Sequence, residues 1–116
     1  MLNIDLEFRY GMLFIRLEGE LNKDNYMKFS NCLENMIYNN GLKYFVINLE
    51  NLTYVDDRGL KEIINKYFDI KLNDGNLVIC GYDNKINNIH NILLKDVFSQ
   101  IRHTNNELNA FKLLSI

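Results

Sequence analysis

The chain has 116 residues, 47% of them hydrophobic, and a formal charge of −2 with acidic and basic residues interspersed. This length and composition predict a single globular domain over residues 1–116 with its own buried core. Because it shows no basic face, no apolar run of about 18 residues and no signal peptide, we expect a cytoplasmic protein that binds no nucleic acid and enters no membrane.

The first part of the chain predicts a β-hairpin followed by a helix. Apolar and polar residues alternate over 2–8, as in a half-buried strand, and a second strand is expected over 12–17. The segment 19–22 is then expected to lead out of the sheet. From about Asp24 the apolar residues recur on one helical face, and this helix is predicted to stop at 39–41, an Asn-Asn-Gly sequence.

A buried strand, a second helix and another strand are predicted next. The run 44–49 is almost entirely apolar, which is typical of a central strand covered on both faces. We expect a short connection over 50–55 and then an amphipathic helix that ends near 73–75. The apolar run 76–80 predicts a further buried strand.

The last part of the chain predicts two helices with a short strand or turn between them. Ile86, Ile89 and Leu93 indicate the first of these helices, and 97–101 the short strand or turn. Residues 104–107 have the spacing of a capping box, which predicts the start of a terminal helix. The order of elements predicts an α/β fold. Its mixed sheet would have an N-terminal antiparallel hairpin, then parallel strands, and pack against about four helices.

Few residues suit metal or catalytic chemistry. Cys32 and Cys80 lie far apart in apolar surroundings, so we expect free thiols rather than a disulfide or a metal pair. His90 and His103 have no partner at metal-ligand spacing. An aspartyl-phosphate receiver needs an acidic cluster beside the first strand, and a phosphate-binding loop needs a glycine-rich run with a lysine. Neither pattern is present, so we expect no enzyme, no metal and no cofactor.

The most unusual local sequence is Asp-Asp-Arg-Gly at 56–59, where the central strand gives way to a helix. Carboxylates are favoured there because the N-terminal end of a helix carries partial positive charge. In a purely structural interpretation, one of the two aspartates caps the helix. Ion pairs Asp57–Lys61 and Arg58–Glu62 then lie on its surface. In a functional interpretation the same residues form a binding site, since α/β proteins often place function at this point.

Residues 48–60 resemble the signature of STAS domains, in which a central strand leads through an apolar-Asp-Ser-Ser-Gly-Leu pattern into a helix. The segment 19–22, Gly-Glu-Leu-Asn, is similar to the family's Gly-x-Leu-Asp, and 76–81 resembles its next strand. The order of elements agrees along essentially the whole chain. The resemblance implies a STAS-like fold for residues 1–116.

Among STAS proteins, a free-standing domain of this size most resembles the bacterial anti-sigma factor antagonists. This resemblance implies a non-catalytic, protein-binding regulatory module that binds an anti-sigma factor, releases a sigma factor and so regulates transcription. The anti-sigma factor in such systems is often a serine kinase of the ATPase-like type. The other role that the resemblance allows is a STAS subunit of another assembly, either a transporter ATPase-associated subunit or a stress-signalling scaffold.

The chain departs from the family at the phosphoacceptor serine, which precedes the glycine of the signature. Arg58 occupies that position and Asp57 that of the serine before it, while Asn22 replaces an aspartate. We therefore expect no phosphorylation at Arg58, and a binding surface with fixed charges on a monomer or a weak homodimer. The predicted partner-binding residues are Asp56, Asp57, Arg58, Gly59, Lys61 and Asn22.

Overall fold

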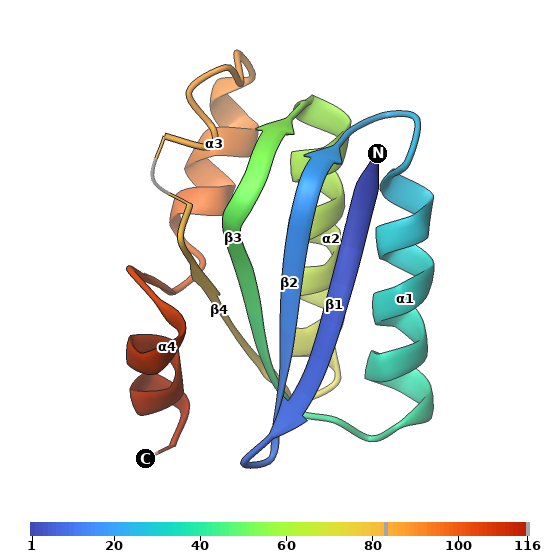
Figure 1. Cartoon of the computed structure of the whole chain (residues 1–116), viewed down its shortest axis with the longest axis vertical. Helices are drawn as coiled ribbons and strands as arrows, with labels where there is room; N and C mark the ends of the chain where they lie inside the picture. Colours follow the sequence, from blue (N-terminus) through green and yellow to red (C-terminus); the bar gives the residue numbers. More distant parts are fainter. Residues whose placement is uncertain (83, 116) are drawn as a thin grey trace.

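The structure of the chain, a computed structural model, describes residues 1–82 and 84–115 and contains one sheet with helices on both faces (Figure 1). The strand order is β1-β2-β3-β4-β5, with β1 antiparallel to β2 and the other neighbours parallel. The predicted mixed α/β sheet is therefore confirmed. Within the described ranges, no helix is both long enough and apolar enough to cross a bilayer. The elements in chain order are β1 (Leu2–Arg9), β2 (Met12–Leu21), α1 (Tyr26–Asn39), β3 (Tyr44–Val55), α2 (Asp57–Leu72), β4 (Asn76–Cys80), α3 (Ile92–Ser99), β5 (His103–Thr104) and α4 (Glu107–Leu114).

Alternate positions along the strands divide the sheet into two apolar faces. Leu13, Ile15 and Leu17 of β2 pack in the core that α1 and α2 cover, and α2 lies behind the strands in Figure 1. Met12 and Phe14 belong to a second cluster on the opposite face, which α4 covers. Because β3 and β4 contribute to both clusters, their sequences are continuous apolar runs, as predicted.

The strands β2 and β3 continue further than the sequence predicted. Residues 19–21 stay in β2 and 50–55 stay in β3, with Leu21 paired to Val55 at the end. The predictions that the first segment leaves the sheet and that the second is a short connection are therefore wrong. Register shifts in β2 interrupt the pairing twice, so the apolar residues of this part no longer recur at every second position.

The third helix begins later than predicted. Residues 84–88 form turns, and α3 starts only after Asn91, whose Oδ1 accepts the N–H of Leu94 at 3.2 Å. The predicted short strand or turn over 97–101 is confirmed only in part, because residues 97–99 are the end of α3 and a turn follows at residue 100. A short strand does follow, but as β5. The buried side chain of Ile89 anchors the loop rather than a helix.

The terminal helix is confirmed, but the predicted capping box is wrong. Asn106 is the cap, since its Oδ1 accepts the N–H of Asn109 at 2.9 Å. The hydroxyl of Thr104 donates instead to the carbonyl oxygen of Asn106, also at 2.9 Å. The carboxylate of Glu107 is therefore not used in capping and points toward the sheet.

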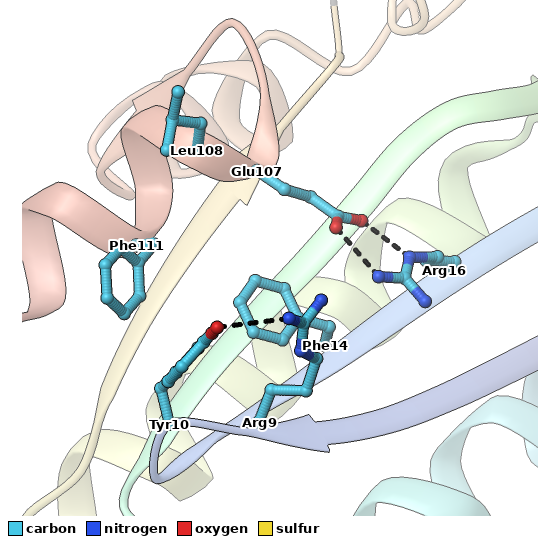
Figure 2. A pocket seen from close by; sticks show the side chains of 7 residues that line it. All are labelled: Arg9, Tyr10, Phe14, Arg16, Glu107, Leu108 and Phe111. Carbon is cyan, nitrogen blue, oxygen red and sulfur yellow. Dashed lines mark hydrogen bonds and ion pairs between the residues drawn. The ribbon is translucent and has the colours of Figure 1, made fainter.

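Glu107 joins α4 to the sheet (Figure 2). Arg16 donates to both oxygens of the Glu107 carboxylate, from Nε at 2.7 Å and from Nη2 at 2.9 Å. Asn48 Nδ2 also donates to it at 2.7 Å. The hydrogen bonds from Arg16 lower the pKa of Glu107 despite partial burial, and Asn48 adds to this effect. This bidentate ion pair fixes the start of α4 over β2 and β3.

Both cysteines are free, as predicted. Cys80 is buried in the cluster beneath α4, where burial raises the pKa of its thiol to about 12. Cys32 is half-buried on α1, and burial raises its pKa as well. Neither thiol therefore has the lowered pKa that a reactive cysteine needs.

We predict that Glu107→Gln reduces stability at neutral pH and flattens its dependence on pH. The folded pKa of Glu107 lies below the ordinary value of 4.5. Its stabilisation is therefore fully present above about pH 4.5 and is lost as the pH falls through the folded pKa. Urea unfolding from about pH 7 to about pH 3 measures this effect. The control is Glu50→Gln, at an exposed carboxylate. Equal pH profiles for the wild type and Glu107→Gln would contradict the prediction.

Candidate functional site

The carboxylate of Asp56 connects the start of α2 to the turn that follows β2. Its Oδ1 accepts the N–H of Gly59 at 2.8 Å, which caps the helix, and its Oδ2 accepts the N–H of Lys23 at 2.9 Å. The N–H of Asp56 donates to the carbonyl oxygen of Leu21 at 3.2 Å. Of the two aspartates predicted as caps, Asp56 is therefore the one that caps. Because both its oxygens are engaged within the chain, Asp56 holds the shape of the site.

Gly59 lets α2 approach the end of β2. A Cβ atom at this position would lie 2.4 Å from the carbonyl oxygen of Leu21 and 2.9 Å from its carbonyl carbon. Glycine alone avoids this overlap, since it carries no side chain. Gly59 is also buried, so its contribution to the site is the close packing of helix on strand.

Arg58 folds back against α1 instead of extending into solvent. Its guanidinium lies over the ring of Tyr26, 3.7 Å from the ring centroid, which is a close cation–π contact. Its Nη2 pairs with Oε1 of Glu62 at 3.0 Å, so the predicted ion pair is confirmed. Its Nη1 is buried and has no hydrogen-bond partner within residues 1–82 and 84–115. The arginine therefore links the first turns of α1 and α2.

The ion pair of Arg58 is the outer end of a buried network of ion pairs between α1 and α2. Glu62 is 4% exposed and Lys66 is 2% exposed, and they pair at 3.2 Å. Lys66 Nζ also lies 3.1 Å from Glu34 on α1 and 3.3 Å from Asp69. The sequence pattern alone did not predict this network of charges. The (i, i+4) spacing of its members on α2 does indicate that they share one helical face.

The charged groups of this buried network stabilise one another's ionised forms. Burial opposes ionisation of Glu62, but hydrogen bonds from Ser30 and Lys66 and the charge of Arg58 outweigh it and lower its pKa. Burial likewise opposes the charge on Lys66, yet its bonds to Glu34 and Glu62 raise its pKa. Both groups are therefore charged at neutral pH, and Arg58 is held by a permanent anion.

An open hollow of about 350 Å³ lies beside the start of α2. Asp57 is exposed at its edge and, within the described part of the chain, forms no ion pair with Lys61, contrary to the structural interpretation. The hollow can thus offer a carboxylate, cations and an aromatic ring to a partner. Its lining residues are Lys23, Tyr54, Asp56, Asp57, Arg58, Asn88 and His90.

Three of the predicted residues, Gly59, Lys61 and Asn22, are not among those that line the hollow. Lys61 is exposed one turn further along α2. Asn22 shapes the turn before α1, where its Oδ1 accepts the N–H of Asp24 at 2.9 Å and its N–H donates to Asn25 Oδ1 at 2.9 Å. Four lining residues were not predicted from the sequence, because only the folded chain brings them to this point: Lys23, Tyr54, Asn88 and His90.

A larger hollow of about 490 Å³ lies on the opposite face of the sheet, between the hairpin turn and α4 (Figure 2). Its charged groups are already partnered within the chain: Arg16 binds Glu107, and Arg9 Nη2 donates to the hydroxyl of Tyr10 at 3.1 Å. Within residues 1–82 and 84–115, no three His, Cys, Asp or Glu side chains are placed to hold a metal ion. The start of α2 therefore remains the candidate site.

Known proteins resemble this chain along nearly its whole length. Residues 3–108 match the sequence profile of the family described as the STAS domain. The chain is 27% identical over 116 residues to an anti-sigma F factor antagonist of Paenibacillus polymyxa. The matched region covers 99% of this chain and 97% of that protein.

Two solved structures show the same fold. The first is a Thermotoga maritima protein provisionally named an anti-sigma factor antagonist, with a TM-score of 0.84, 16% identity, and coverage of 97% of this chain and 95% of that one. The second is the Bacillus cell fate determinant SpoIIAA in its phosphorylated form, with a TM-score of 0.70, 15% identity, and coverage of 96% and 99%. At these identities the similarity concerns the fold alone.

Gly59→Ala is predicted to lower the free energy of unfolding by about 2 kcal/mol, because the added Cβ meets the carbonyl of Leu21. Urea denaturation monitored by circular dichroism measures the loss. Lys61→Ala, at an exposed position on the same helix, serves as the control and should change stability by less than about 0.5 kcal/mol. The prediction fails if the two variants are equally stable.

Arg58→Ala is predicted to destabilise the fold by about 1–2 kcal/mol, because it removes the contact with Tyr26 and one partner of the buried Glu62. Arg58→Lys should recover only part of the loss, since an ammonium can pair with Glu62 but stacks less well on the ring. A double-mutant cycle with Tyr26→Leu isolates the cation–π contribution. A coupling energy of zero would rule that contribution out.

Proposed function

This chain belongs to the STAS domain family, and we propose that it acts as a non-catalytic anti-sigma factor antagonist whose binding surface is the start of α2. Its relatives are anti-sigma factor antagonists, which supports a regulatory role. In the proposed mechanism the chain binds an anti-sigma factor. The anti-sigma factor then releases the sigma factor that it had held, and the sigma factor directs transcription.

The observation that carries the proposal is the arrangement of Asp57, Arg58 and Lys61 at one helix start. Arg58 stands where the family has its phosphoacceptor serine, and its guanidinium is held by Tyr26 and Glu62. It has no hydroxyl that could accept a phosphate. The exposed Asp57 and Lys61 present a fixed pattern of charges instead, which a partner can read through complementary charges.

Regulation by serine phosphorylation at this position is therefore absent in the proposed function. Phosphorylation of a serine there would add almost two negative charges next to the helix start and change the electrostatic fit to a partner. The chain already places the fixed carboxylate of Asp57 at that point, and the neighbouring cation of Arg58 is neutralised by Glu62. We infer that these residues set the affinity for the partner, and that the concentration of the protein controls how much complex forms.

Incubation with the host's anti-sigma factor kinase and ATP, followed by intact-mass measurement, is expected to leave the wild-type mass unchanged while a complex forms. The reason is the missing hydroxyl at position 58. Arg58→Ser is the matched control, because it restores the family's residue and should gain one phosphate. Stoichiometric phosphate on wild-type residues 53–59 would contradict the proposal, as would a kinase that forms no complex with the protein.

The contribution of the fixed charges is tested by calorimetry with the same anti-sigma factor. Asp57→Lys is expected to weaken binding by about tenfold or more, since a reversed charge at an interface costs more than about 1.4 kcal/mol. Asp96→Lys changes the net charge equally on α3, away from the hollow. Equal losses for the two variants would show that only the net charge matters and would remove Asp57 from the interface.

A further inference from the structure

The outer edge of β1 has unused backbone hydrogen-bonding groups. The N–H of Glu20 donates to the carbonyl oxygen of Met1, so in this one-to-one antiparallel register the odd residues of β1 bond to β2. The even residues therefore direct their N–H and C=O groups away from the sheet. Lys28 of α1 caps one of these groups, the carbonyl oxygen of Leu2. The backbone groups of Ile4, Leu6 and Phe8 have no partner in the described part of the chain.

An apolar groove runs along this edge on the side of α1. A hollow of about 350 Å³ lies between β1 and α1, and Phe8, which lines it, is 59% exposed. Lys28, Cys32 and Met36 share one face of α1 because of their (i, i+4) spacing, and the half-buried Met36 lines the hollow. The residues that line the hollow are Leu6, Phe8, Leu13, Met36, Asn40 and Leu42. A strand added here would find apolar contacts on one of its sides.

The other face of the same edge is acidic. Asp5 and Glu7 alternate with the apolar residues of β1 and point to the opposite side of the sheet. Both carboxylates share the guanidinium of Arg16, at 3.0 and 2.8 Å, and Arg16 also binds a third carboxylate on α4. Arg9 reaches Glu7 only at 3.5 Å. Carboxylates thus outnumber cations, and the side chain of Asp5 is 69% exposed to solvent.

We propose that the β1 edge is a docking site for an extended segment of a partner protein, in which apolar and basic residues alternate. The backbone of the segment would pair with Ile4, Leu6 and Phe8 as an added strand of the sheet. Its apolar side chains would enter the groove beside α1, and its basic side chains would lie over Asp5 and Glu7. This surface is separate from the start of α2, so the two sites can be occupied together.

A second copy of the chain fits this edge poorly. The antiparallel registers in which two β1 strands overlap most set Asp5 or Glu7 of one copy against Asp5 or Glu7 of the other. Like charges directly opposite on neighbouring strands are destabilising. Lys28, bound at one end of the edge, also shortens the stretch available for pairing. The acidic face therefore favours a partner with the opposite charge.

The probe for a test is a short synthetic peptide in which lysine alternates with valine, titrated into the ¹⁵N-labelled full chain. We expect the amides of Ile4, Leu6 and Phe8 to shift and to exchange more slowly with solvent. The same peptide with glutamate in place of lysine should bind about tenfold more weakly, because its charges oppose those of the edge. Equal binding of both peptides, or shifts confined to other elements, would overturn the proposal.

Two variants distinguish peptide binding at the β1 edge from effects of net charge alone. Leu6→Pro removes an outward N–H while the bonds between β1 and β2 remain, so it should abolish peptide binding. If Leu6→Pro does not fold, Asp5→Lys still tests the proposal and should weaken binding about tenfold, while Asp96→Lys on α3 should not. Self-association of the unliganded protein that Leu6→Pro or Asp5→Lys alters would identify a second copy as the occupant and would also overturn the proposal.

Discussion

The buried carboxylate of Glu62 must be neutralised within the protein, and this requirement determines the direction of Arg58. A buried carboxylate left without any cationic partner would cost several kcal/mol. Lys66 supplies one cation from inside the helix interface, and Arg58 supplies the other from the helix start. Since Arg58 also stacks on Tyr26, the same interaction fixes the entry of α1 against α2.

The position at which the resemblance to the family would place a phosphoacceptor serine therefore takes part in helix packing in this chain. A regulatory serine has to be reachable by a kinase, and its surroundings must accommodate both the phosphorylated and the unphosphorylated side chain. Arg58 is instead held by Tyr26 of α1 and by Glu62 of its own helix α2. Meanwhile Asp56 and Gly59 keep the local geometry of the signature, the first through its bonds to two backbone N–H groups and the second through its contact with Leu21. In the proposed function, the geometry of the site is retained and regulation by phosphorylation at position 58 is absent.

The sequence predicted the elements whose patterns are local. The alternation in β1, the apolar runs in β3 and β4 and the (i, i+4) pair of Arg58 with Glu62 were all recognisable, and the structure confirms them. Other features depend on distant contacts. Register shifts hid the far ends of β2 and β3, and the direction of Arg58 over Tyr26 depends on how α1 packs. The bond between Arg16 and Glu107 joins residues 91 positions apart, so no local pattern could predict it.

The most direct test of the account is to map the binding face on the ¹⁵N-labelled protein with the unlabelled host anti-sigma factor. We expect the largest amide shifts around the start of α2, in residues 22–24, 54–61 and 88–90, because these segments surround the hollow beside Asp57. The map should be the same with and without ATP, since no phosphate is added at position 58. Shifts concentrated on α4 or on β1, with the start of α2 unchanged, would contradict the account.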